Sequence, residues 1–420
     1  MSNFKTRVPV IVLDADIRSQ EGVIQSLGKH GVPVIAISHL EDCPAFYSKY
    51  VVDTLVSPFI DDGGEAYIEF LLGLPEKGVL VYSNDVSAVI LARHQVRLLD
   101  AGFLLNLPSS ENLEKVFDKY TCSQLADSFG ISFPQTSLVR NKKDIESVWD
   151  TFQKPVIIKG TRMAGGQYEI LSSLDEVDNA LELVQGRVEA KAYRARESEL
   201  MLQQFLEYGM TDCWHCETVY GQQSRPMGHF TIRHIRTSFL DNGGFGSRLF
   251  AGEHVFSQEL IDMTDKLLTS MHWKGFANVD FIYQPKDKKF YLLEVNPRLP
   301  GFSFYPSRAG YEMAYLYYLD LIGETPKDVP DSYHSSIYFE TLRSPGDFTH
   351  GIINILKGHM KIWPYVCSYF RILKPGVQKV IEPVRLEDMG FTLRTLRNDS
   401  LWFLGWISGY LKRKIFSSKR

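Results

Sequence analysis

The sequence predicts an α/β fold joined to an α+β unit, and three parts of the chain support this. Strand-like and helix-like segments alternate through the N-terminal part, which is typical of a doubly wound parallel sheet. A strand, a glycine-containing loop and a second strand are expected at residues 154–172. An acidic β-hairpin is expected at residues 275–296. We therefore expect more than one structural unit.

The composition is that of an ordinary globular protein. The chain has 420 residues, of which 44% are hydrophobic and 23% are charged. This length is enough for roughly two or three domains. No apolar run reaches the ~18 residues of a membrane span, and no cleavable apolar segment precedes the first expected strand. The 5 cysteines are mostly scattered, which suits reduced thiols, so we predict a cytoplasmic protein.

Residues 1–110 are predicted to form the doubly wound N-terminal domain. Strand, helix and strand at this spacing indicate parallel units with right-handed crossovers. No G-x-G-x-x-G motif follows the first strand, which argues against a nicotinamide or flavin site. Polar residues 14–19 and 83–85 follow strands, where such sheets bind ligands, although helix capping explains them equally well. The expected strands are 8–13, 32–38, 51–56 and 78–82, and the expected helices are 19–30 and 65–72.

A second unit is expected at residues 111–330, with a smaller lid subdomain at about 150–207. A proline-opened cap near residue 107 predicts a helix that carries Asp118 and Lys119. Pro134 and a polar stretch after it mark the passage toward the lid subdomain.

The loop at residues 161–167 has the character of a phosphate-covering lid. It joins two expected strands, unlike a P-loop, which joins a strand to a helix and ends in G-K-[ST]. Gly165 and Gly166 let backbone N–H groups approach a polyphosphate closely. Lys159 adds a positive charge at the mouth of the loop. An ordinary hairpin loop is the alternative.

A further strand is expected at residues 199–207. Its last residues could offer backbone groups to an adenine base, with Glu207 placed for a ribose. A later strand at residues 227–236 carries Arg233 and Arg236.

Residues 275–296 predict a β-hairpin because a polar turn separates two strands. The hairpin brings Asp280 beside Glu294. Alternation along the second strand then places Leu292, Glu294 and Asn296 on one face.

The end of this hairpin suits a metal ion and a phosphate. The carboxylates of Asp280 and Glu294 and the amide of Asn296 are hard oxygen donors, which can share Mg²⁺ with the phosphates of a nucleotide. Pro297 ends the strand, and Arg298 adds a fixed cation suited to phosphate. A polar strand end that meets solvent is the alternative for this stretch taken alone.

Taken together, these segments resemble the ATP-grasp superfamily over roughly residues 8–325. A doubly wound domain, a strand with a glycine loop, a hinge strand and an acidic hairpin ending in E-x-N-P-R occur in the family's order. The hairpin end at residues 294–298, followed by Ser-Arg-Ala-Gly at 307–310 and Leu-Ile-Gly-Glu at 321–324, is most similar to the branch of ATP-dependent carboxylate–amine ligases near biotin carboxylase and D-aspartate ligase.

The resemblance implies how ATP would be held. Lys119 and Lys159 would bind the α and β phosphates, and Gly165 and Gly166 would cover them. The sequence departs from the family at the hinge, where two glutamines stand in place of the frequent Glu-Lys pair. The implied adenine-binding residues are Gln203, Gln204, Phe205 and Leu206, with Glu207 at the ribose.

The resemblance also implies the metal ligands and the phosphoryl-stabilising cations. Asp280, Glu294 and Asn296 would bind Mg²⁺, with Mn²⁺ as an alternative ion. Asp280 stands where many relatives have Glu, so its reach is shorter by one methylene. Arg298, together with Arg233 or Arg236, would stabilise the transferring phosphoryl group.

The implied activity joins a small carboxylate, such as an amino acid, to an amine. ATP would phosphorylate the carboxylate to an acylphosphate, which the amine then attacks. Two alternatives stay open: activation of bicarbonate by a carboxylase or carbamoyl-type enzyme, and a nucleotide-binding regulator that has lost turnover.

Residues 331–420 are predicted to form a basic, aromatic-rich helical extension. Residues 351–420 hold 13 Lys or Arg against 4 Asp or Glu, whereas the whole chain has a net charge of −4. The segment 400–420 is too short and too basic to span a bilayer, but it could lie on an anionic inner membrane surface. Packing on the catalytic body or in a homodimer interface is the alternative. Nucleic acid is not an expected partner because the rest of the chain is acidic.

Cys213 and Cys216 have the spacing of a zinc or redox motif, with His215 between them. No second pair lies at a matching distance, and positions three apart on a strand face opposite sides. We therefore expect no zinc there, and we expect His229 and His234 to be strand residues rather than ligands.

Overall fold

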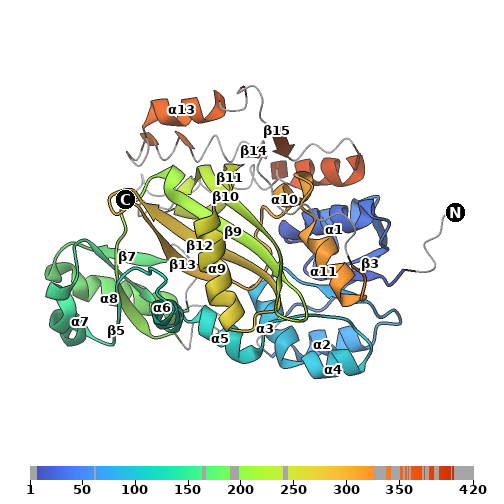
Figure 1. The fold of residues 1–420 in the computed structure, drawn as a ribbon, viewed down its shortest axis with the longest axis horizontal. Coiled ribbons are helices and arrows are strands. Elements are labelled where there is room, and N and C mark those ends of the chain that lie inside the picture. The colour runs from blue at the N-terminus through green and yellow to red at the C-terminus, as the bar shows by residue number, and fades with distance from the viewer. Residues whose placement is uncertain are drawn as a thin grey trace, which may run out of the picture.

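The computed structural model is shown in Figure 1. The described residues are 7–60, 63–162, 167–189, 198–239, 245–325, 337–341, 351–352, 355–356, 358, 361–370, 373, 378–382, 387–398 and 400–401.

The N-terminal unit is built on a parallel sheet with the strand order β3-β2-β1-β4. The winding reverses after β3, as in doubly wound sheets, so this prediction is confirmed. The central strand β1 is completely buried because sheet neighbours and helices enclose it. The elements are β1 (Val10–Val12), α1 (Ser19–Lys29), β2 (Val34–Ser38), β3 (Val51–Val56), α2 (Glu65–Leu72), β4 (Val79–Val81), α3 (Asp85–Arg93) and α4 (Gln95–Asp100).

The prediction of one helix that carries both Asp118 and Lys119 is wrong, because one helix ends and another begins there. Helix α5 (Ser110–Phe117) ends before Asp118, and α6 (Lys119–Ser128) begins after it. Asp118 is extended and its side chain accepts a hydrogen bond from the backbone N–H of Thr121, which is an N-cap. Lys119 is therefore the first residue of a helix.

The smaller subdomain predicted after the N-terminal unit is a four-stranded antiparallel sheet, seen with α7 and α8 in green in Figure 1. We call it the lid. Its strands run in the order β5-β8-β6-β7, and its own hydrophobic core lies beneath α8. The predicted strand, loop and strand are present, but Gly165 and Gly166 lie outside the described residues. The lid also includes β5, which lies before residue 150. Its elements are β5 (Thr136–Val139), α7 (Lys142–Val148), β6 (Val156–Gly160), β7 (Tyr168–Leu171), α8 (Val177–Glu189) and β8 (Leu200–Gln204).

The third and largest sheet has seven strands in the order β13-β12-β9-β10-β11-β14-β15. Helix α9 (Gln258–Ser270) packs against β9 and β10 through a second hydrophobic core. The strands are β9 (Cys213–Tyr220), β10 (Pro226–Phe239), β11 (Phe245–His254), β12 (Gly275–Gln284), β13 (Lys289–Asn296), β14 (Ile337–Thr341) and β15 (Gln378–Glu382).

The predicted acidic hairpin is confirmed, with one correction. Strands β12 and β13 are antiparallel, and Asp280 lies directly opposite Glu294. A bulge at Leu293 interrupts the alternation, because Phe281 pairs with Leu292 while Asp280 pairs with Glu294. Leu292 is consequently buried in the core and does not share a face with Glu294.

The sequence predicted a helical C-terminal extension, but the described part of this region also contains strands. Its described part contributes β14 and β15 to the edge of the large sheet, in addition to helix α13 (Ile362–Phe370). None of the described helices is long and apolar enough to cross a membrane. Residues 402–420 lie outside the described ranges, so their contact with a membrane surface stays a prediction.

Two helices after the hairpin connect it to the N-terminal unit. Helices α10 (Phe304–Arg308) and α11 (Met313–Leu321) both pack against α1. The approach is closest at Gly22, where an added Cβ would lie 2.7 Å from Cα of Phe304. Glycine is required there for space. Within the described residues, short 3₁₀ helices lie at Pro44–Tyr47, Trp149–Thr151, Leu174–Glu176 and Met210–Asp212.

We expect Gly22→Ala to lower the free energy of unfolding by roughly 1 to 3 kcal/mol, because the methyl group overpacks the contact between α1 and α10. Gly186→Ala in α8 is the matched control. Nothing lies within 4 Å of its added Cβ, so helix propensity should make this variant slightly more stable. Urea unfolding measures both, and equal stability of Gly22→Ala and the wild type would contradict the packing argument.

Candidate functional site

A cavity of about 700 Å³ lies where the N-terminal unit, the lid and the acidic hairpin meet. We call it the main cavity. Lid strands β6 and β8 line it on one side, and β9, β12 and β13 line it on the other. The following predicted site residues line it together: Lys119, Lys159, Gln203, Gln204, Phe205, Leu206, Asp280, Glu294, Asn296 and Arg298.

The acidic end of the main cavity is formed by the cross-strand pair Asp280 and Glu294. The side-chain amide of Asn296 donates to Oδ2 of Asp280 at 3.3 Å and to Oε1 of Glu294 at 3.5 Å. The amide of Asn278 donates to Oδ1 of Asp280 at 2.5 Å. Burial and the nearby Glu294 carboxylate raise the pKa of Asp280, although His215 opposes this. Two carboxylates are thus held side by side.

Two lysines balance this charge. Nζ of Lys119 lies 3.2 Å from Oε2 of Glu294. Burial alone would raise the pKa of Glu294, but Lys119, Lys159 and a hydrogen bond with Asp280 together lower it to about 2. Burial, with the neighbouring Lys119, lowers the pKa of Lys159 to about 7. An additional anion beside Lys159 would therefore favour its protonated form and raise its pKa.

Arg298 reaches from the hairpin end to the N-terminal unit. Its Nε donates to Oδ1 of Asp85 at 3.0 Å, and its terminal nitrogen donates to Oδ1 of Asn296 at 3.4 Å. Asp85 is the first residue of α3, within the polar stretch that the sequence pointed to as ligand contact or cap. Asn84 is in fact the cap of α3, and both residues line the main cavity. This polar stretch therefore both caps α3 and lines the main cavity.

Three predicted site residues are not brought into the lining of the main cavity. Glu207 is exposed. Arg233 forms an ion pair with Glu253. Arg236 is 1% exposed and lies over the ring of Tyr369 at 3.8 Å. The proposed roles of these residues stay predictions.

The hinge residues lie at the end of β8. The side chain of Gln203 donates to Oγ1 of Thr136 at 2.9 Å, and the backbone N–H of Phe205 donates to the carbonyl of Pro155 at 3.3 Å. Those two donors are therefore engaged in the lid itself. Gln204 and Leu206 line the cavity beside them.

Two histidines for which we predicted no ligand role, His215 and His234, line the main cavity. Nδ1 of His215 lies 2.6 Å from Oδ1 of Asp280, and its Nε2 contacts Nε2 of His234. Burial, then the neighbouring His215, lowers the pKa of His234 well below its ordinary value. The register of β9 and β12 places His215 opposite Asp280, and no local pattern in the sequence sets that register.

The Cys213 and Cys216 pair is divided between two environments. Cys213 lines the main cavity, whereas Cys216 is completely buried in the second core. The two thiols thus lie on opposite faces of β9, as strand alternation predicts.

The hairpin end fits a magnesium ion. Asp280 and Glu294 would supply carboxylate oxygens, and Asn296 would supply its amide oxygen after rotation of the amide. Within the described ranges, no three His, Cys, Asp or Glu side chains gather as metal ligands. Two carboxylates and an amide suit magnesium, which takes its other oxygens from water and phosphate.

Solved structures of similar shape fix the fold. Biotin carboxylase from Campylobacter jejuni, solved as a β-γ-ATP complex, aligns with a TM-score of 0.64 at 12% identity over 80% of this chain and 76% of that chain. The biotin carboxylase domain of 2-oxoglutarate carboxylase from Hydrogenobacter thermophilus, solved with MgADP and bicarbonate, aligns with a TM-score of 0.62 at 13% identity over 79% and 74%. The chain has the ATP-grasp fold.

Curated relatives agree with the ATP-grasp assignment. D-aspartate ligase from Enterococcus faecium is 22% identical over 291 residues, which are 64% of this chain and 66% of that protein. Urea amidolyase from Lachancea kluyveri is 22% identical over 309 residues, which are 66% of this chain and 15% of that protein. These matches confirm the predicted resemblance to ATP-grasp carboxylate–amine ligases.

The chain thus spans less than two thirds of the curated relatives it matches first, from 15% to 66% of their lengths. No known protein-family profile matches it.

We expect Lys159→Met to stabilise the ligand-free protein near pH 7. Burial and Lys119 lower the pKa of Lys159 from 10.5 to about 7, so the folded chain holds this proton less tightly than the unfolded chain. The resulting penalty is full below pH 7 and fades as the pH rises toward 10.5. The stability gain of Lys159→Met should fade over the same window.

Urea unfolding at several pH values measures this gain. Lys143→Met, at an exposed lysine in α7, is the control for loss of a surface charge. A gain at Lys159 that is absent, or that stays constant from pH 7 to 10, would contradict the electrostatic account.

Proposed function

We propose that this protein is an ATP- and magnesium-dependent ligase that joins a small carboxylate to an amine. The observation that carries the proposal is the gathering of Lys119, Lys159, Asp280, Glu294 and Arg298 in one cavity, from segments far apart in the chain. The ATP-grasp fold and the similarity to D-aspartate ligase support the same class of reaction.

The phosphates of ATP would be bound by the two lysines. Lys119 is paired with Glu294 at 3.2 Å, and burial lowers the pKa of Lys159 to about 7. A polyphosphate beside them would favour the protonated form of Lys159 and give Lys119 a second partner. The adenine would lie against the end of β8, near Gln204 and Leu206.

The acidic hairpin would hold the metal. Asp280, Glu294 and Asn296 are the residues for it, and a bound magnesium ion supplies charge neutralisation for the phosphates. Nδ1 of His215 donates to Oδ1 of the Asp280 carboxylate at 2.6 Å, so it fixes the direction of that carboxylate.

The reaction needs no protein nucleophile. A substrate carboxylate oxygen attacks the γ-phosphorus, the bond to the β–γ bridging oxygen breaks, and ADP leaves. The amine nitrogen then attacks the acyl carbon, inorganic phosphate leaves with the C–O electron pair, and an amide remains. Arg298 would stabilise the transferring phosphoryl group, since it lines the cavity and Arg233 and Arg236 do not.

Bicarbonate activation is a second candidate for the same cavity. The structural neighbour solved with MgADP and bicarbonate favours it, because it aligns over most of the chain. The two candidates differ in the acid that is phosphorylated. ADP release that depends on bicarbonate, and on no organic carboxylate, would select the second.

We expect Glu294→Ala and Asn296→Ala each to lower substrate-dependent ADP release by at least about a hundredfold, because each removes an oxygen ligand of the metal that neutralises the phosphates. The measurement is ADP release over a panel of small carboxylates and amines, with circular dichroism as the check of folding. Glu182→Ala, on the exposed side of α8, should keep the wild-type rate. Unchanged turnover in both hairpin variants would refute the metal assignment.

A further inference from the structure

Helix α13 carries an apolar face that points away from the protein. Its residues Ile362, Trp363 and Phe370 are 62%, 73% and 61% exposed. Together with Val366 and Cys367 they lie on one side of the helix, because positions four residues apart share a face. Figure 1 shows α13 at the outer margin of the molecule, beyond β10 and β11. The outward side of this helix is therefore apolar.

The inward side of α13 carries hydroxyl groups and is held by β10. Tyr365 and Ser368 are only 4% and 5% exposed. Arg236 of β10 donates to Oγ of Ser368 at 3.3 Å and lies over the ring of Tyr369 at 3.8 Å. A surface helix usually buries its apolar side and exposes its polar side. In α13 this arrangement is inverted, and the contacts with β10 fix the helix in that orientation.

The chain on either side of α13 also exposes apolar side chains. Leu356 is 81% exposed and Leu373 is 69% exposed. Gly351 lies against α13, since an added Cβ there would be 2.0 Å from Cζ of Tyr365, and the next residue, Ile352, is 41% exposed. Single exposed apolar side chains are common on protein surfaces, but a group of them marks an interaction site. We call the group the α13 patch, and it consists of Ile352, Leu356, Ile362, Trp363, Phe370 and Leu373.

The charge of this stretch indicates what kind of partner it would meet. Residues 351–380 contain 5 Lys or Arg and no Asp or Glu, whereas the whole chain has a net charge of −4. Lys361, which directly precedes α13, is exposed. Apolar side chains with basic residues around them complement a surface that is both apolar and anionic. The headgroup region of a membrane that contains anionic lipids has both properties.

The same charge argues against three other occupants. In a symmetric dimer the patch of one copy would meet the same patch of its partner, so the basic stretches would repel each other. Residues 402–420 of this chain carry 5 Lys or Arg and no Asp or Glu, so they too lack the complementary charge. Nucleic acid would supply the charge, but its polar surface offers little to aliphatic side chains such as Leu356 and Ile362. A phospholipid surface matches both the apolar and the basic residues.

We propose that α13 and its patch dock this protein onto a membrane that contains anionic phospholipids. The inference goes beyond the proposed ligase function and does not depend on it. With 9 residues, the helix would lie in the plane of the membrane surface. Trp363 and Phe370 would enter the boundary between headgroups and acyl chains, and Lys361 would face the phosphates. The membrane contact predicted from the sequence lay at residues 400–420, so this proposal moves it to a segment within the described residues.

The test is flotation of the full chain with lipid vesicles, of phosphatidylcholine alone or with about one third phosphatidylglycerol. We expect binding to the anionic vesicles to be at least about tenfold tighter and to weaken as salt is added, because the basic residues act through charge. Trp363→Ser should weaken this binding at least about tenfold, because it removes a large apolar side chain from the contact. Phe59→Ser, at an aromatic residue of the N-terminal unit that is 71% exposed, is the matched control and should bind as the wild type does.

A second variant separates charge from apolar contact. Lys361→Glu should weaken binding to the anionic vesicles and leave the weaker binding to phosphatidylcholine unchanged. Trp363 and Lys361 are both exposed, so circular dichroism should show both variants folded. Their rates of ADP release should equal that of the wild type, because neither residue lines the main cavity.

No binding to anionic vesicles, or equal binding by the wild type and Trp363→Ser, would overturn the proposal. Loss of binding in a Lys412→Glu, Lys414→Glu double variant, with Trp363→Ser unaffected, would assign the contact to residues 402–420 instead. A dimer in sedimentation velocity that Trp363→Ser dissociates, with no vesicle binding, would assign the patch to a second copy of the chain. Each of these results leaves the ligase proposal untouched, because vesicle binding is measured without ATP.

Discussion

Two carboxylates face each other across the acidic hairpin, and much of the surrounding structure serves to hold that charge. Asp280 and Glu294 are in register on β12 and β13, and a half-buried pair of like charges is unfavourable unless cations or donors surround it. Lys119 pairs with Glu294, Asn296 donates to both carboxylates, and His215 contacts Asp280. A metal ion would complete this arrangement, because it adds positive charge where the carboxylates already point.

The same contacts connect the structural units. Arg298 extends from the hairpin end to Asp85 at the start of α3, with 3.0 Å between Nε and Oδ1. The backbone N–H of Lys119 donates to the carbonyl of Thr161 in the lid at 2.9 Å, and Arg162 forms an ion pair with Glu114 at 2.5 Å. Of the charged side chains proposed for the nucleotide, Arg298 therefore also joins the hairpin end to the N-terminal unit. An anion in the main cavity would compete with Asp85 for Arg298, so its binding would weaken the contact between the hairpin end and the N-terminal unit.

Local patterns in the sequence were sufficient for the hairpin and for most residues of the main cavity. The polar turn and the two flanking strands place Asp280 opposite Glu294 without help from the rest of the chain. Alternation failed where the backbone departs from a regular strand. A bulge at Leu293 turns Leu292 into the core, and a one-residue insertion of this kind leaves no mark in a hydrophobic pattern.

Irregularity also explains the arginines of β10. The pairing of β10 with β11 shifts register around His234 and Arg236, so the side chains there do not follow simple alternation. Arg236 lies over Tyr369 and bonds Ser368, both on α13. The sequence of β10 alone cannot indicate that the guanidinium of Arg236 packs against a helix more than a hundred positions later. His215 and His234 were passed over for a related reason, since their contact joins two strands whose register depends on the whole sheet.

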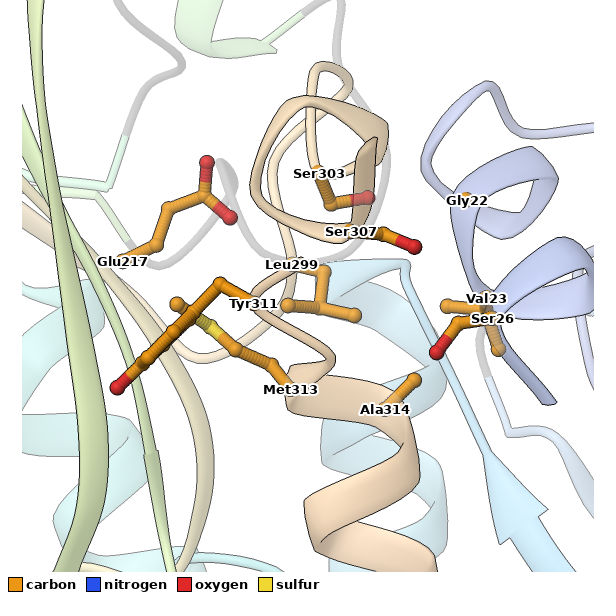
Figure 2. A pocket seen from close by; sticks show the side chains of 10 residues that line it. All are labelled: Gly22, Val23, Ser26, Glu217, Leu299, Ser303, Ser307, Tyr311, Met313 and Ala314. Carbon is orange, nitrogen blue, oxygen red and sulfur yellow. The ribbon is translucent and has the colours of Figure 1, made fainter. Parts of the chain in front are cut away.

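The segment after the hairpin lines both the main cavity and a second, much smaller cavity of about 10 Å³ (Figure 2). Pro300, Gly301 and Phe302 line the main cavity, whereas Leu299 and Ser303 line the small one. Strand β9 is shared in the same way, with His215 at the main cavity and Glu217 at the small one. Two positions apart on a strand correspond to roughly 6.5 to 7 Å and the same face. The segment 299–303 and one face of β9 are therefore walls that both cavities share.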